Sequence, residues 1–329
     1  MMNDPITKID DENELQTIEK QPLQYWGNNF YIKAATSENT RLAYQSDIRH
    51  FESWGGKLPA IPQFIVEYLH AFADKLNART LTRRLIALKN WHQYQGFLDP
   101  TNHPAIQKTM AGIMRIHAKP KQKAHPLSPE DLILIIKKLN KDDSFSAYRD
   151  KALLQIGFYG AFRRSELVNI KVEDIEWKNQ GIDILIPRSK TDQNHSGQYC
   201  AIPFGKNEFC PISSLNDWLK ISDIKQGFLF REIKKGGKLG DDALTPLSVN
   251  HILKKRAHEA GILYASDLSS HSLRRGLATS ASRFGAELQS IMRQGRWKNV
   301  NTVIEYIEAT ARFDENAALS ILNMMNEEK

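Results

Sequence analysis

A basic stretch flanked by prolines divides this chain into two parts, and it limits the possible folds more than any other feature. Residues 115–125 read Arg-Ile-His-Ala-Lys-Pro-Lys-Gln-Lys-Ala-His, contain no acid, and are followed by Pro126. Proline holds the preceding residue in an extended conformation, and a run of one charge sign extends by self-repulsion. We therefore expect an unpacked linker at 117–127. A chain of 329 residues is long enough for about two domains, one on either side.

Before the linker, apolar residues recur at helical spacing in four segments, with Thr80 as the expected N-cap of the third and a turn at Asp99-Pro100-Thr101. This pattern predicts a small all-α domain over 25–116, behind an acidic, disordered tail at 1–24. The stripes are Tyr44, Ile48 and Phe51; Ile65, Leu69, Phe72 and Leu76; Leu81, Leu85 and Leu88; and Ile106, Met110 and Ile113.

After the linker, residues 128–329 combine helical and β signals. Ser128-Pro129 has the order of an N-cap followed by a first helical residue. The predicted fold class is therefore mostly α with a small antiparallel β-sheet (α+β). Helices are expected near 129–140, 146–158, 247–260, 272–284, 287–294 and 300–308, and strands at 175–177, 182–186 and 199–202.

The charge distribution points to an anionic partner. The formal net charge is +7, but residues 1–20 hold six acids against two lysines, so the remainder carries +11. Residues 75–98 contain five cations and no acid, which indicates either an anionic partner or an ordinary exposed face, and this segment alone does not separate the two readings. Candidate DNA contacts are Arg83 and Arg84; Lys119, Lys121 and Lys123; and Lys254, Lys255 and Arg256, the last three being alternatively a helix end rich in cations.

Several other classes of protein are disfavoured. The longest aliphatic run, Leu132 to Ile136, is far shorter than the roughly 18 to 20 residues of a membrane span. The acidic start is unlike a signal peptide, and Cys200 and Cys210 match no metal-ligand spacing, so we expect a cytoplasmic, nucleoid-associated protein without a metal. The sequence contains no Gly-Lys-Ser/Thr loop, and the glycines at 236–240 are expected to form a flexible turn.

Five short motifs follow one another in the C-terminal two thirds of the chain. Each is weak alone: Arg-x-x-Glu is common as a helix-surface ion pair, and His and Arg three residues apart share a helix face by chance. Together and in this order they are difficult to explain by structural needs. The motifs are Arg163-Arg164-Ser165-Glu166-Leu167, Ser189-Lys190-Thr191, His271-Ser272-Leu273-Arg274, Gly295-Arg296-Trp297 and Glu305-Tyr306-Ile307.

This set resembles the active site of the tyrosine recombinase (phage integrase) family, and residues 291–307 resemble its Cre-like members. Upstream, Asn39-Thr40-Arg41 and Tyr44 resemble the family's first core-binding helix, so the likeness covers nearly the whole chain after the acidic tail. It implies an all-α, SAM-like core-binding domain and a mixed catalytic domain that together form a C-shaped clamp on DNA. It also implies site-specific DNA recombination.

The resemblance assigns a role to each motif. Arg163 and Arg274 would clamp the scissile phosphate, and Trp297 would donate its indole N–H to a non-bridging oxygen. Tyr306 would be the nucleophile, His271 its proton acceptor, and Lys190 the general acid for the leaving 5′ oxygen. Glu166, expected on the same helix face as Arg163, would orient that arginine. The product would be a 3′-phosphotyrosyl enzyme formed without metal, ATP or another cofactor.

The neighbours Arg164 and Arg275 are expected to contact the DNA backbone or to be surface charges. By resemblance, the partners are double-stranded DNA with specific sites and other copies of this chain in a homotetramer on two DNA sites, joined by a tail that begins near Ala317. The alternative for the tail is packing on its own domain. A type IB topoisomerase and a regulator without catalysis remain alternative functions; the helical first domain disfavours the former and the filled active-site positions the latter.

Overall fold

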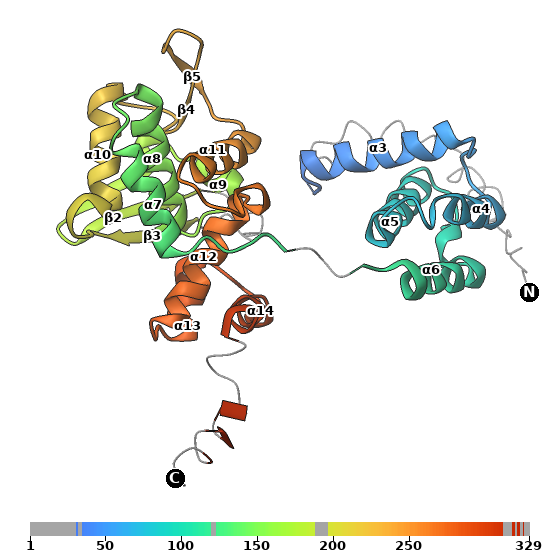
Figure 1. Cartoon of the computed structure of the whole chain (residues 1–329). Coiled ribbons are helices and arrows are strands. Elements are labelled where there is room, and N and C mark those ends of the chain that lie inside the picture. The colour runs from blue at the N-terminus through green and yellow to red at the C-terminus, as the bar shows by residue number, and fades with distance from the viewer. Residues whose placement is uncertain are drawn as a thin grey trace, which may run out of the picture. The chain divides into compact units, whose positions relative to one another are not determined.

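The chain forms two compact units, residues 1–122 and 123–329, in a computed structural model that describes residues 31, 35–119, 123–187, 197–311, 318–319, 321–322 and 325 (Figure 1). Each unit has its own hydrophobic core. The predicted acidic tail at 1–24 lies outside the described residues, as does most of the predicted C-terminal tail. Among the described helices, none has the length and apolar character needed to cross a bilayer.

The first unit is all-α. Its elements are α3 (Glu38–Trp54), α4 (Pro62–Phe72), α5 (Ala78–Tyr94), the 3₁₀ turn η2 (Pro100–Asn102) and α6 (Pro104–His117). The four predicted apolar stripes supply its core, where Ile65, Leu81 and Ile106 are fully buried. The predicted cap of α5 was wrong: the side chain of Asn77, not Thr80, accepts the N–H of Arg79 at 2.9 Å. Asn77 takes this place because the helix already begins at the buried Ala78.

A buried carboxylate, Asp47, binds two of the arginines that we predicted to contact DNA. Arg83 forms a fork with Nε and Nη2 at 2.8 Å from the two oxygens of Asp47 and leaves half of its side chain exposed. Arg84 is 9% exposed and donates to the hydroxyl of Tyr68 at 2.6 Å, with its Nε 3.5 Å from Asp47. The predicted DNA contact was therefore wrong for Arg84, because helix packing buries its guanidinium. Arg83 remains a candidate.

The second unit is α+β, and its helices and strands confirm the predicted fold class. The helices are α7 (Pro129–Leu139), α8 (Phe145–Tyr159), α9 (Arg164–Val168), α10 (Pro211–Ser222), α11 (Pro246–Glu259), α12 (Ser270–Arg283), α13 (Leu288–Gly295) and α14 (Val300–Ala311). Helix α8 is buried on nearly every side and packs against α7, α10 and α12, so it forms the centre of this unit (Figure 1). Helix α10 was not predicted.

A three-stranded antiparallel sheet, in the order β1-β2-β3, lies beside these helices. It consists of β1 (Ile175–Lys178), β2 (Gly181–Ile186) and β3 (Gln198–Pro203), close to the predicted ranges. The central strand β2 has most of its side chains buried, which explains its strong aliphatic signal. The turn predicted at Gly236-Gly237 joins a hairpin that was not predicted, β4 (Arg231–Ile233) and β5 (Leu239–Ala243).

The end of the predicted linker is packed, contrary to our expectation. Leu127 is fully buried, and its N–H donates to the carbonyl of Ser272 at 3.0 Å. The ring centroids of His125 and Tyr264 lie 3.9 Å apart. The charged composition of the segment concealed the contribution of this single apolar residue, which enters the core directly before the N-cap Ser128.

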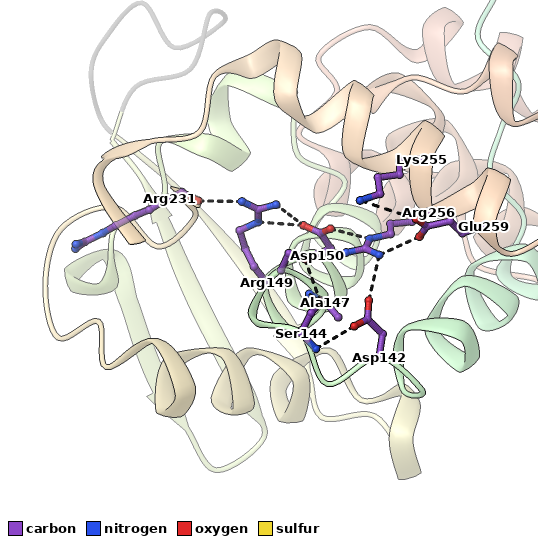
Figure 2. A network of polar contacts seen from close by, with 10 residues as sticks. Asp142, Ser144, Ala147, Arg149, Asp150, Arg231, Lys255, Arg256 and Glu259 are labelled. Atoms are coloured by element: carbon purple, nitrogen blue, oxygen red, sulfur yellow. Dashed lines mark hydrogen bonds and ion pairs between the residues drawn. The ribbon is translucent and has the colours of Figure 1, made fainter. Parts of the chain in front are cut away.

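A second predicted DNA contact, Arg256, lies in a buried ion network (Figure 2). Its Nε donates to Asp150 at 2.8 Å and its Nη1 to Glu259 at 2.9 Å. The other oxygen of Asp150 accepts two bonds from Arg149, which in turn donates to the carbonyl of Arg231 at 3.2 Å. The prediction for Arg256 was therefore wrong, because this side chain neutralises acids inside the fold. Lys254 and Lys255, beside it on α11, are exposed.

The network predicts that removing a buried acid lowers the free energy of unfolding much more than removing an exposed acid. Asp150→Ala would leave Arg149 and Arg256 buried without their shared carboxylate, so we expect the free energy of unfolding to fall by about 3 to 5 kcal/mol. Asp241→Ala removes a fully exposed acid, 3.5 Å from Arg231, and should change little. Urea titration of both variants measures the difference. Equal losses would contradict the structural role of Asp150.

Candidate active site

Four of the predicted catalytic residues come from different elements of the second unit. Arg163 directly precedes α9, Arg274 lies on α12, Trp297 follows α13, and Tyr306 lies on α14. The guanidinium of Arg274 lies 4.2 Å from the centroid of the Trp297 ring, and that ring lies edge-on to Tyr306 with centroids 6.2 Å apart. Helices α12, α13 and α14 pack together, as Figure 1 shows, and so bring these side chains into one place.

The turn between α8 and α9 anchors the positive charge of the site. Ala161 has a left-handed backbone, with φ of 45°, and its carbonyl accepts a hydrogen bond from Nη1 of Arg274. The Nη2 of Arg274 is buried and has no hydrogen-bond partner among the described residues. Burial, and then the charge of Arg163, lower the pKa of Arg274 to about 9. The group is still protonated at pH 7, so it presents an unneutralised cation to the site.

Glu166 binds Arg163 in a way that differs from our expectation. Arg163 is not on the helix but is its N-cap, and Glu166 sits three residues later inside α9. The carboxylate accepts the backbone N–H of Arg163 at 2.9 Å and a second bond from its guanidinium at 2.5 Å. Burial alone would raise the pKa of Glu166, but the Arg163 N–H and the charges of Arg296 and Arg163 outweigh burial and lower it. Glu166 is thus an anion that fixes Arg163.

The chain reversal at the end of α13 positions Trp297 in the site. Arg296 is left-handed, with φ of 55°, and the N–H of Trp297 returns to the carbonyl of Met292 at 3.0 Å. This reversal folds the indole back over Gly295. A Cβ at Gly295 would lie 1.8 Å from the ring, so the close approach requires glycine there.

The surroundings of Tyr306 include an arginine whose position we did not predict. Arg275 is 6% exposed, its guanidinium lies 5.0 Å from the ring centroid of Tyr306, and its Nη1 donates to the carbonyl of Ala124. Beside it, Lys123 forms an ion pair with Glu305. Of the two alternatives predicted for Arg275, a surface charge is contradicted, since the packed end of the linker encloses the side chain, and a contact with the DNA backbone stays a prediction.

Several other predicted site residues have exposed side chains where the structure describes them. His271 lies in the first turn of α12 with an exposed side chain, one turn before Arg274. The side chains of Lys119, Lys254, Lys255 and Arg164 are exposed, so they are accessible to a binding partner. Lys190 and Lys121 lie outside the described residues. Within the described ranges, no three His, Cys, Asp or Glu side chains are grouped as metal ligands.

Arg296 lies in the motif Gly295-Arg296-Trp297, but no role was predicted for it from the sequence. Arg296 is 7% exposed; its two terminal nitrogens lie 3.1 Å from the carbonyl of Gly160, and Nη2 is 3.3 Å from Glu166. No periodicity signals such a contact, because it depends on the left-handed backbone at 296 and on the distant turn at 160.

Comparison with known proteins places this chain in a family. Residues 125–312 match the phage integrase family, and residues 23–95 match the phage integrase N-terminal SAM-like domain. The chain therefore belongs to the phage integrase family. It is a tyrosine recombinase, an enzyme of site-specific DNA recombination.

Individual relatives and solved structures support the assignment. The chain is 36% identical over 304 residues to an integrase/recombinase xerD homolog of Selenomonas ruminantium, covering 89% of this chain and 88% of that protein. It is 26% identical over 302 residues to the recombinase cre of Escherichia phage P1, covering 84% and 86%. The fold is similar to that of the Tn1549 transposon integrase in complex with circular intermediate DNA, with a TM-score of 0.60, 16% identity and coverage of 93% and 100%.

The close packing of Gly295 against Trp297 can be tested by mutation. Gly295→Ala should lower the free energy of unfolding by about 1 to 3 kcal/mol and alter the near-ultraviolet circular dichroism, because the indole must move. Gly112→Ala, in α6, is the control: its added methyl meets nothing within 4 Å, so it should be neutral or stabilise by up to about 1 kcal/mol. Stability of Gly295→Ala equal to that of the wild type would disprove the close approach.

Proposed function

We propose that this enzyme cleaves and rejoins duplex DNA through a 3′-phosphotyrosyl intermediate on Tyr306, in a tetramer that joins two DNA sites, without metal or ATP. The observation that carries the proposal is the group formed by Arg274, Trp297 and Tyr306: a buried cation lies 4.2 Å from an indole, whose ring lies 6.2 Å from a phenol. A phosphate held by the first two would lie beside the third.

The chemistry of a phosphodiester explains these residue types. The anionic oxygens repel a nucleophile, so catalysis needs positive charge where negative charge develops in the transition state. A guanidinium stays charged and contacts two phosphate oxygens at once. Arg163 and Arg274 supply two such groups, and the buried Nη2 of Arg274 still has a hydrogen bond to donate. Trp297 adds one indole N–H.

Proton transfers complete the reaction. A neutral phenol is a weak nucleophile, so Tyr306 must lose its proton as it attacks phosphorus, and His271 is the proposed acceptor. As the new bond forms, the bond from phosphorus to the 5′ oxygen breaks, and Lys190 protonates the leaving oxygen. The bond from phosphorus to the tyrosine oxygen replaces the broken bond to the 5′ oxygen, so the intermediate is still a phosphodiester, and attack by the free 5′ hydroxyl reverses the step without an energy source.

The partners follow from charge and from the relatives. Two recombinases of similar fold were determined on DNA: the XerH site-specific recombinase with a palindromic difH substrate, and a lambda integrase dimer with a COC′ core site. For this chain we propose that the two units clamp duplex DNA and that Arg83, Lys119, Lys121, Lys123, Lys254 and Lys255 contact the phosphate backbone. Docking of the C-terminal tail on a neighbouring copy would close the tetramer.

The nucleophile is tested by trapping. On a nicked suicide duplex carrying the target site, which footprinting of DNA beside the gene would locate, the wild type should form a covalent adduct. Tyr306→Phe removes the attacking oxygen, so the adduct should disappear while binding, measured by gel shift, persists. Tyr199→Phe, a change on an exposed part of β3, is the matched control and should still be trapped. An adduct formed by Tyr306→Phe would exclude this nucleophile.

The general acid is tested through the leaving group. Lys190→Ala should slow cleavage of ordinary DNA by roughly 10²- to 10⁴-fold, because the 5′ oxygen then leaves without a proton. A substrate with sulfur at the bridging 5′ position has a leaving group that needs no protonation, so its cleavage rate should be nearly normal. Equal slowing on both substrates would remove Lys190 from this role.

Recombination is separated from simple strand relaxation by the products. Supercoiled plasmids with paired target sites should yield recombinant circles, whereas plasmids without the sites should remain supercoiled. Efficient relaxation of both plasmids, with no recombinant product, would instead indicate a topoisomerase activity.

A further inference from the structure

Glu166 is shared by two arginines that lie in different surroundings. On one side is Arg163, whose side chain is 24% exposed and whose charge contributes to the lowered pKa of Arg274. On the other side is Arg296, whose side chain is 3% exposed, as is that of Glu166. The carboxylate therefore bonds an outer arginine that can reach a substrate and an inner arginine that cannot.

The inner arginine is held by contacts that a surface charge would not have. Both its terminal nitrogens donate to the carbonyl of Gly160 at 3.1 Å, and its guanidinium carbon lies 4.8 Å from the centroid of the Phe162 ring. These contacts tie the end of α13 to the turn before α9. Its Nε is buried without a hydrogen-bond partner in the described part of the chain. The guanidinium thus has few alternative positions.

The backbone conformation at Arg296 has an unfavourable conformational free energy. Arg296 adopts a left-handed conformation, with φ of 55°, which costs a residue with a Cβ roughly 1 to 2 kcal/mol. Glycine would adopt this turn freely and would still lead the chain back to Trp297. The presence of a long charged residue where glycine suits the backbone indicates that the side chain has a function there.

We propose that Arg296 is a positioning residue that acts through Glu166, holding the carboxylate so that it fixes the guanidinium of Arg163 against the scissile phosphate. The inference rests on the proposed phosphoryl transfer. Arg296 itself touches no substrate. Its bonds to Glu166 and to the Gly160 carbonyl hold the carboxylate in place on the buried side. The two bonds from Arg163 to the same carboxylate then fix the position of Arg163.

The test uses the full-length enzyme, first with three single arginine variants and then with Glu166→Gln alone and combined with Arg296→Gly. Arg296→Gly relieves the backbone and removes the guanidinium, Arg296→Lys keeps a charge but loses the planar fork, and Arg283→Ala removes an exposed arginine that pairs with Glu130 at 3.6 Å as a control. Single-turnover trapping on the nicked duplex gives the cleavage rate, and gel shift and urea titration give affinity and stability.

We expect Arg296→Gly to stay folded and to bind DNA with wild-type affinity but to cleave roughly 10- to 100-fold more slowly, since a small displacement of a phosphate-binding group has an effect of this size. Arg296→Lys should recover only part of the rate. Adding Glu166→Gln to Arg296→Gly should cause little further loss, because both changes interrupt the same path. The control should match the wild type.

The pH profile separates positioning from a merely structural role. The charged or thiol groups around Glu166 are Arg163, Arg274, Arg296 and Cys200. Without Arg296, burial weighs more, the pKa of Glu166 rises, and the carboxylate protonates at a higher pH as the solution is acidified. The decline in cleavage rate caused by protonation of Glu166 should therefore begin at a higher pH in Arg296→Gly, separately from the decline caused by protonation of His271, which should not move.

Each outcome distinguishes the two proposals. If the wild type is not trapped at all, the proposed reaction fails. If the wild type is trapped and Arg296→Gly cleaves at the same rate with the same pH profile, the reaction stands and the role of Arg296 is excluded. A rate loss that only follows lost stability, or that adds fully to the loss from Glu166→Gln, would likewise exclude it.

Discussion

The structure of the site depends on the hydrogen bonds between two arginines and the turn at Gly160 and Ala161. The carbonyls of this turn accept bonds from Arg296 and Arg274, which come from the end of α13 and from α12. Carbonyl dipoles stabilise a buried guanidinium without cancelling its charge, whereas a carboxylate partner would cancel it. The turn therefore fixes the positions of α12, α13 and α9 relative to one another and preserves positive charge at the place where they meet.

Elsewhere in the chain, arginines are neutralised by acids. Arg256 binds Asp150 and Glu259, and Arg83 and Arg84 share Asp47, so these cations stabilise the fold. The site differs because Arg163, Arg274 and Arg296 surround one carboxylate, that of Glu166. Burial, and then the charges of Arg163 and Arg296, lower the pKa of Arg274, as expected for a cluster with more cations than anions.

Much of the fold and of the site could be predicted from the sequence, and the failures share a cause. The stripe of Ile65 and Leu69 and the aliphatic run of β2 depend on local periodicity, which the sequence displays directly. The burial of Arg84 and Arg256 depends on partners 37 and 106 residues away, Asp47 and Asp150, so charge alone gave the wrong prediction. Helix α10 and the β4–β5 hairpin lacked a periodicity strong enough to distinguish them from loops.

The same contrast explains how one chain uses a basic composition for two purposes. A net charge of +7 determines association with an anion but cannot say which cations are free to bind it. Arginines with buried acidic partners, such as Arg256 with Asp150, are neutralised inside the fold, whereas exposed lysines such as Lys254 stay available for the proposed contacts with phosphates. Arg274 differs from both, because it is buried against a carbonyl group: in the proposed reaction, low polarity would strengthen its attraction to the phosphate and salt would weaken it little. Water is already excluded from that guanidinium in the folded enzyme. Part of the free energy needed to desolvate the guanidinium is therefore spent during folding, before a substrate binds. This is the preorganisation that the proposed phosphoryl transfer requires.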